Sequence, residues 1–337
     1  MLRAALRYFA PPMQAVLAVT VPFFALVLCG YLAGRQHVLP ESAIPGLNAF
    51  VLYFALPCML FRFGAGVPVL ELLNPALLLL WLGCAMLIVF FTIAFSLNKR
   101  VHLKDASFGA LVAAFPNTGF MGVPLLVALL GPAAGGPAIC TILADIFVTS
   151  SLCIALAQAH GAAGQGARVA VLRALRGALS NPLPWSIALG AVFSVTGLSL
   201  PGPVGAIVNM LADAASPVAL FTIGAVLFRA GQHADPKKGR TPLRDYLPVA
   251  LVKLLLHPLL VLVLGLAARS LGAPLSSFQL MVLVLAAALP SASNVSLLAE
   301  RYGADNGRIA RIIMTSTVLA FATFSTAAWL FGVDAGR

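Results

Sequence analysis

Two short stretches, AAFPNTGFMG and AALPSASNV, interrupt long apolar runs with residues that break helices and form hydrogen bonds. Their prolines, glycine and small polar residues are Pro116, Asn117, Thr118, Gly119, Pro290, Ser291, Ser293 and Asn294. Proline costs about 3 kcal/mol or more in a helix interior, so each stretch predicts an unwound segment. A helix that restarts after such a break points free amides and its positive dipole end at the break. We therefore predict that the two stretches bind a small anion; the simpler alternative is that the prolines only kink helices.

Ionisable residues inside apolar runs form a second set of candidates. Asp145, Asp213 and Lys253 each lie within such a run. Charges at membrane depth are costly and usually functional, so we predict roles in ion or proton coupling, with Asp145 the first choice and Asp213 the second. Three alternatives stay open. Asp145 could make a buried structural hydrogen bond, Lys253 could extend to the headgroups, and Asp213 could pair with Lys253.

Composition indicates what must hold these residues. Hydrophobic residues make up 61% of the 337-residue chain and charged residues only 9%, against about 25% charged in ordinary soluble domains. This predicts an all-α integral membrane protein that contacts the lipid bilayer. The net charge of +11 is spread between the apolar runs, which favours membrane topology over a nucleic-acid partner. We expect no cofactor and no metal, because the five cysteines lie apart inside apolar runs.

The apolar runs predict ten membrane spans, because a bilayer needs roughly 20 apolar residues per helix. The predicted spans are residues 14–33, 42–64, 72–96, 106–131, 136–159, 182–199, 203–228, 246–268, 276–299 and 308–331. The two unwound stretches then fall in spans four and nine.

Internal similarity suggests that the spans form two repeats. PCMLFRFG in span two matches PVALFTIG in span seven at four of eight positions, and AAFP in span four resembles AALP in span nine. Chance similarity between leucine-rich strings is the alternative. Five spans per half is an odd number, so equivalent helices would cross in opposite directions, as in an inverted repeat. We predict a first repeat in residues 1–180 and a second in residues 181–337.

Basic residues predict the orientation, because loops rich in lysine and arginine stay on the cytoplasmic side. We number each loop by the span that precedes it. The even-numbered loops contain only Arg62 and Arg269. The odd-numbered loops contain Arg35, Lys99, Arg100, Lys104, Arg168, Arg173, Arg176, Arg229, Lys237, Lys238, Arg240, Arg244, Arg301, Arg308 and Arg311. Cytoplasmic odd loops place both termini outside. Arg3 and Arg7 near the N-terminus favour the opposite orientation.

Sequence motifs also restrict the class of function. The chain has no HExxH, GxSxG or GxxxxGK[ST] motif, so we expect no enzyme and no nucleotide-driven pump. A carrier for a small organic anion fits the repeats and the isolated polar pairs. A channel or receptor on the same scaffold is the second hypothesis, but a channel would need a continuous polar path.

Five motifs together resemble the auxin efflux carrier family. They are LNAFVLYFALPCMLF (47–61), FPNTGFMGVPL (115–125), SPVALFTIGAVL (216–227), VKLLLHPLL (252–260) and LPSASNVSLLAERYGAD (289–305). They occur in order along nearly the whole chain, and the short loop between spans five and six is similar to that of bacterial members. Asn48 and Tyr53, in the first motif, complete the candidate substrate-binding residues.

The resemblance implies the ten-helix inverted-repeat fold shared with bile-acid/sodium symporters, with a scaffold domain, a transport domain and crossed helices at spans four and nine. It further implies elevator-type alternating access for organic acids such as malonate, malate, lactate or auxin-like acids. Pro116, Pro290 and Asn117 correspond to the crossing residues of the family. The sodium ligands of the bile-acid symporters have no clear counterparts, which favours protons over sodium as the coupling ion. A multi-pass protein of the bacterial inner membrane, with a homodimer as one arrangement, is the expected setting.

Overall fold

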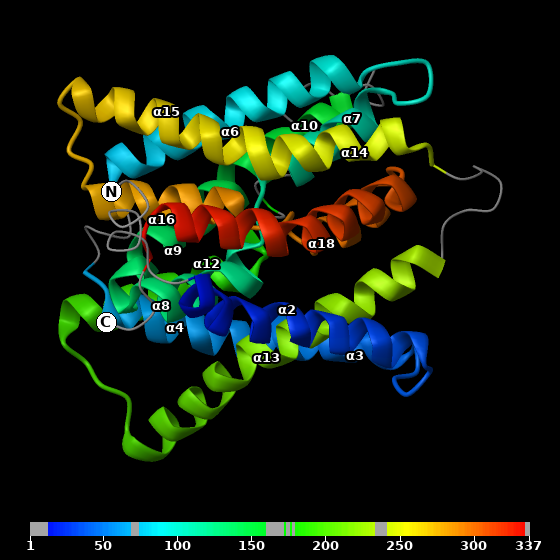
Figure 1. The fold of residues 1–337 in the computed structure, drawn as a ribbon. Helices are drawn as coiled ribbons and strands as arrows, with labels where there is room; N and C mark the ends of the chain where they lie inside the picture. The colour runs from blue at the N-terminus through cyan, green and yellow to red at the C-terminus, as the bar shows by residue number, and fades with distance from the viewer. Residues whose placement is uncertain are drawn as a thin grey trace.

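The computed structural model describes residues 13–68, 74–159, 172, 176, 179–232 and 241–333, and the secondary structure in these ranges is helical apart from one isolated β-bridge (Figure 1). Its α-helices and short 3-10 or π segments (η) are α2 (Met13–Arg35), α3 (Ala43–Phe50), η1 (Val51–Ala55), α4 (Leu56–Gly66), α6 (Pro75–Ser96), α7 (Leu103–Ala114), η2 (Thr118–Gly122), α8 (Val123–Leu130), η3 (Pro132–Ala134), α9 (Gly135–Ala144), η4 (Asp145–Thr149), α10 (Ser150–Ala159), α12 (Pro182–Thr196), α13 (Gly202–Gln232), α14 (Leu243–Leu251), η6 (Val252–Leu256), α15 (His257–Ser270), α16 (Ser277–Ala288), α17 (Val295–Arg301) and α18 (Asn306–Leu330).

These helices confirm the predicted helical membrane class. Seven continuous helical segments among the described residues are long and apolar enough to cross a bilayer, and three shorter apolar helices accompany them. The shorter ones are Thr118–Leu130, Pro182–Thr196 and Ser277–Ala288. Two of the three adjoin the polar stretches, because α7 ends at Ala114 before η2 begins, and α16 ends at Ala288 before α17 begins.

The predicted span 182–199 ends earlier than expected, and a glycine explains the difference. Helix α12 stops at Thr196, because Gly197 caps it with a φ of 66°. This left-handed conformation ends many helices and suits glycine, which has no Cβ.

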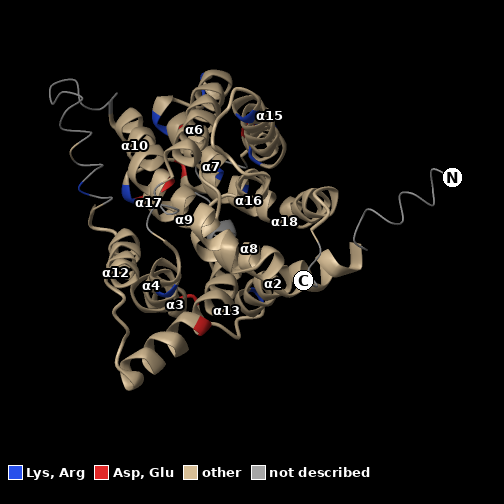
Figure 2. Cartoon of the chain, turned by 90° about the vertical axis from the view of Figure 1, so that its left-hand side faces the viewer, with Lys and Arg blue, Asp and Glu red and all other residues tan. Residues whose placement is uncertain are grey.

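The helices pack as two groups. The first helix group contains α2, α3, α4, α12 and α13, in which α13 packs along α2 and α4, and α12 packs on α4. The second contains α6 to α10 and α14 to α18, with α6 on α7 and α15, and α15 on α16. Viewed along the helices in Figure 2, the first group lies below the second. Helix α8 is the part of the second group that lies at the boundary with the first. Helix α2 contacts α8 and α18 across this boundary.

Close glycine contacts fix the first helix group. A Cβ on Gly30 of α2 would lie 1.8 Å from the carbonyl oxygen of Phe221, and a Cβ on Gly224 of α13 would lie 1.9 Å from that of Val27. Gly30 and Gly34 form a GxxxG pattern, which lets membrane helices approach each other closely. We infer that α2 and α13 move as one rigid unit.

A buried arginine joins three odd-numbered loops in the second group. Arg308 is 2% exposed, and its Nε donates to the Asp245 carbonyl oxygen at 2.7 Å while Nη1 donates to that of Asp105 at 2.9 Å. The Asp305 amide donates to the Asp105 carboxylate at 2.7 Å. These hydrogen bonds place the three loops at one end of the molecule. Arg308 itself lies in the first turn of α18 and not in a loop. Five other basic residues used for the orientation lie outside the described residues, as do Arg3 and Arg7: Arg168, Arg173, Lys237, Lys238 and Arg240.

Prolines also account for three of the π-helical segments. Pro57, Pro124 and Pro258 each follow a π segment by two residues, after η1, η2 and η6 respectively. A proline ring clashes with the carbonyl four residues earlier, and a widened turn relieves the clash. Pro124 therefore shapes the turn that follows the first polar stretch.

The helix that leads to the second polar stretch starts with a capping box, which gives a stability prediction. The Ser276 hydroxyl accepts from the Gln279 amide at 3.0 Å, and the Gln279 side chain accepts from the Ser276 amide at 3.0 Å. We expect Ser276→Ala to destabilise the protein by about 1 kcal/mol, because one helix-end amide loses its partner. Thermal unfolding in detergent measures the change. Ser277→Ala is the control, and an equal loss there would contradict the capping role.

Candidate functional site

The two polar stretches meet in space and bond to each other. The amide of Asn117 donates to the Pro290 carbonyl oxygen at 2.8 Å, and the amide of Ala292 donates to the Phe115 carbonyl oxygen at 3.0 Å. These bonds form an isolated antiparallel bridge between Pro116 and Ser291. We call residues 115–119 and 290–294 the crossing. Each break thus supplies backbone partners for the other, as irregular backbone at membrane depth requires.

Several buried polar atoms at the crossing have no hydrogen-bond partner within the described part of the chain. They are Asn117 Oδ1, Thr118 Oγ1, Ser291 Oγ and Asn294 Oδ1. Asn117 is 3% exposed, and Thr118 and Ser291 are fully buried. Most buried polar atoms in proteins are paired, because an unpaired one costs about 1–3 kcal/mol. Such a cluster is typical of a place where a polar ligand or water completes the hydrogen bonds.

The two half-helices that restart at the crossing differ. On the η2 side, Met121 and Gly122 donate to the Asn117 carbonyl oxygen, and the amides of Gly119 and Phe120 have no backbone acceptor among the described residues. A Cβ built on Gly119 would meet nothing within 4 Å, so open space lies beside Gly119. On the α17 side, turn carbonyls already accept from the first amides of a helix only seven residues long. Of the two breaks in the described chain, the first therefore has helix-start amides without a backbone acceptor, whereas the first amides of α17 are already paired.

Asp145 lies in a buried hydrogen-bonded cluster. It is fully buried, and its Oδ1 accepts from Trp81 Nε1 and from Thr149 Oγ1, both at 3.0 Å. Its Oδ2 has no hydrogen-bond partner among the described residues. One carboxylate oxygen thus makes the structural hydrogen bonds that we considered as the alternative, and the other remains unpaired there.

Lys253 is fully buried and does not extend toward the headgroups. Its Nζ donates to the Ala287 carbonyl oxygen at 2.6 Å, lies 3.3 Å from His257 Nδ1 and interacts electrostatically with Asp145. The His257 ring lies 5.3 Å from that of Trp81. These four side chains, Trp81, Asp145, Lys253 and His257, form what we call the buried network. Because Ala287 precedes Pro290 by three residues, the network holds the helix end that leads into the crossing.

Three predicted residues lie elsewhere. Asp213 does not pair with Lys253; its carboxylate accepts from Arg62 at 2.7 Å, and its side chain is 69% exposed. Tyr53 is 60% exposed, and Asn48 is partly buried in α3. None of the three forms a hydrogen bond to the crossing in the described part of the chain.

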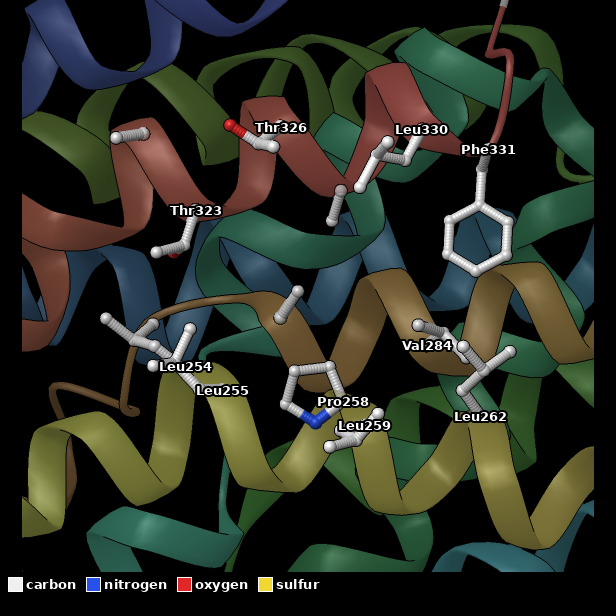
Figure 3. A pocket seen from close by; sticks show the side chains of 13 residues that line it. Leu254, Leu255, Pro258, Leu259, Leu262, Val284, Thr323, Thr326, Leu330 and Phe331 are labelled. Atoms are coloured by element: carbon white, nitrogen blue, oxygen red, sulfur yellow. The ribbon is translucent and has the colours of Figure 1, made fainter.

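An apolar cavity of about 710 Å³ lies beside the buried network, between α15, α16 and α18 (Figure 3). Leu254 and Pro258 face Thr323 and Leu330 across it. All its described walls come from the second helix group, and the lining is apolar apart from the hydroxyls of Thr323 and Thr326. Among the described residues, the cavity therefore offers fewer hydrogen-bond donors to an anion than the crossing does.

Trp81 is the member of the network that sequence reasoning missed. It lies in the apolar run PALLLLWLGCAM, where a tryptophan reads as one more hydrophobic residue. Because Trp81 is fully buried, its indole N–H requires a hydrogen-bond acceptor within the protein, and the Asp145 carboxylate is that acceptor. His257 stands four residues after Lys253, and this helical spacing was the available signal for their contact.

Comparisons with known proteins relate the whole chain to membrane transporters. A protein of Rhizobium meliloti (strain 1021) named "Putative malonate transporter" is 29% identical over 314 residues, which cover 92% of this chain and 94% of that protein. The "Uncharacterized transporter YfdV" of Escherichia coli (strain K12) is 27% identical over 84% of this chain and 87% of its own. An "Uncharacterized transporter" of Methanothermobacter thermautotrophicus is 27% identical over 91% and 94%.

The family comparison covers almost the whole chain. Residues 15–330 match the family Mem_trans, described as membrane transport protein. This range includes every helix at the crossing and in the buried network. The chain belongs to the Mem_trans family of membrane transport proteins, the auxin efflux carrier family that its motifs resemble.

Proposed function

We propose that the protein is a secondary active transporter of small organic anions and that the crossing binds the substrate. The observation that carries this proposal is the cluster of buried, unpartnered polar atoms where the two breaks bond to each other. A transported molecule must bind and then leave again, and neutral hydrogen-bond groups can hold an anion without an ion pair that has to be broken for release. The crossing offers such groups without a charged side chain.

Carboxylates are the substrate class that this chemistry favours. A carboxylate accepts hydrogen bonds, and the crossing provides the hydroxyls of Thr118 and Ser291 and the amides of Gly119 and Phe120 as donors. The side-chain amides of Asn117 and Asn294 each carry a donor as well as an acceptor. The name of the Rhizobium meliloti relative makes malonate the first compound to test, followed by malate, lactate and auxin-like acids.

The position of the crossing supports alternating access as the mechanism. Helices η2 and α8 contact α13 and α2, so the crossing lies against the first helix group. We propose that the first group is a fixed scaffold and that the second group carries the crossing across the membrane in an elevator-type movement. The ten helical segments would then form two inverted repeats, residues 1–180 and 181–337, in an inner membrane with both termini outside.

Coupling to protons is the part of the proposal that rests on the buried network. Protonation of Asp145 would remove the negative charge that faces Lys253, and Lys253 holds the Ala287 carbonyl at the end of α16. A change in that bond would alter the second break. Proton uptake at Asp145 can thus favour one arrangement of the crossing over another.

Uptake into proteoliposomes tests the function. Purified protein is reconstituted, and radiolabelled malonate, malate, lactate and indole-3-acetate are offered with a proton gradient or a sodium gradient imposed separately. We expect uptake of at least one carboxylate above protein-free vesicles, and stimulation by the proton gradient. Stimulation by sodium alone would replace the proton by sodium as the coupling ion. No uptake or binding of any carboxylate would contradict the proposed function.

A further inference from the structure

We propose that a second cavity, between the two helix groups, binds an uncharged aromatic molecule. This intergroup cavity has a volume of about 500 Å³, within the range of about 300–1,000 Å³ for small-molecule sites. It is lined by Phe24, Val27, Leu28, Tyr31, Leu227, Met314, Thr315, Thr317, Val318, Leu319 and Phe321. None of these residues belongs to the crossing, so the site is distinct from the proposed substrate site.

The walls of the intergroup cavity come from both helix groups. Helices α2 and α13 form one wall, and the glycine contacts at Gly30 and Gly224 hold that wall rigid. Helix α18 of the second group forms the other wall. Any relative movement of the two groups therefore changes the shape of the cavity, and a molecule that fills it favours one arrangement.

The chemistry of the lining favours an aromatic ring over an anion. None of the described lining residues is lysine, arginine, aspartate or glutamate, and the Thr317 hydroxyl already donates to the Ile313 carbonyl oxygen at 2.7 Å. Phe24 and Phe321 contact edge to face, with ring centroids 5.3 Å apart, and Tyr31 supplies a third ring. Aromatic molecules bind well among such rings because edge-to-face and offset contacts are favourable.

Helices α2 and α18 pack against each other next to this cavity. Besides the Phe24–Phe321 pair, the described residues of the two helices share one side-chain hydrogen bond, in which the Ser325 hydroxyl donates to Thr20 Oγ1 at 3.3 Å. A neutral aromatic molecule would contact apolar side chains on both walls, and its van der Waals contacts, about 0.1–0.2 kcal/mol per atom pair, add up over many pairs. We expect bound molecules to slow transport by holding the groups together, a consequence that rests on the proposed function.

Photolabelling with benzophenone, an uncharged aromatic probe, tests the site directly. The reconstituted full-length protein is irradiated with benzophenone, and the labelled residues are mapped by mass spectrometry. We expect saturable labelling concentrated on the lining residues, Met314 foremost, and at least about a tenfold loss of that label when Thr315→Trp fills the cavity. Val263→Trp, at a lipid-facing position of α15, is the matched control and should leave the label unchanged.

A second filling variant and a second readout keep the test decisive. Leu28→Trp fills the cavity from α2 and should remove the label if Thr315→Trp fails to fold. Labelling that does not saturate, or that spreads evenly over lipid-facing residues such as Leu79 and Phe90, would overturn the proposal, because the probe would then only dissolve in lipid. Labelling does not depend on transport, so it separates this proposal from the proposed function. Where transport is present, benzophenone should lower the maximal rate without changing KM.

Discussion

Replacing Asn117 by leucine is expected to lower carboxylate uptake by about 10- to 100-fold. Hydrogen bonds to charged groups contribute about 1.5–3 kcal/mol, and each 1.4 kcal/mol changes affinity tenfold. The amide of Asn117 that bonds to Pro290 belongs to the backbone, so Asn117→Leu keeps the contact between the two breaks. Initial rates of uptake over a range of substrate concentrations measure the effect.

The same substitution elsewhere is the control for this prediction. Asn209 lies exposed on α13, away from the crossing, and Asn209→Leu should transport at the rate of the unchanged protein. Size-exclusion profiles and thermal midpoints of both variants show whether they fold. Equal rates for folded Asn117→Leu and the unchanged protein would remove the crossing from the substrate path.

Replacing Asp145 by asparagine is expected to abolish the stimulation of uptake by an imposed proton gradient. An asparagine oxygen can still accept from Trp81 and Thr149, so the buried network keeps its hydrogen bonds while the group that takes the proton is lost. Exchange of labelled for unlabelled substrate, which needs no net proton movement, should continue. Uptake is measured with and without a gradient, and exchange is measured in the same vesicles.

The variant Asp213→Asn tests which of the two carboxylates predicted from the sequence couples transport to protons. Asp213 is exposed and paired with Arg62, and we expect its asparagine variant to keep the response to the proton gradient. If Asp213→Asn lost that response while Asp145→Asn kept it, the coupling role would belong to the ion pair on the first helix group. The buried network would then be structural.

The sequence was sufficient to predict the helical membrane class and the places where helix is interrupted. Apolar runs and proline each act locally, so their positions translate directly into helices and breaks, as at Pro116 and Pro290. One predicted span was too long, because helix α12 ends at the Gly197 cap. The exact end of a helix depends on the backbone conformation of its capping residue, which hydropathy does not describe.

Partners of buried charges could not be predicted in the same way. Asp213 and Asp145 both read as carboxylates at membrane depth, yet one is exposed beside Arg62 and the other is buried beside Trp81. The difference depends on which helix faces pack together, and a single sequence does not specify this. The difference between the two half-helices at the crossing could not be predicted either. It depends on whether nearby turn carbonyls accept from the first amides of each half-helix, as they do for α17.

The central claim is that a carboxylate binds at the crossing, and a cryo-electron microscopy structure of the reconstituted protein with its best-transported carboxylate tests it most directly. Ligand density between Asn117 and Ser291, within hydrogen-bond distance of the amides of Gly119 and Phe120, is the predicted result. Density for the carboxylate at another place, such as beside the exposed guanidinium of Arg62, with the crossing empty, would contradict the claim.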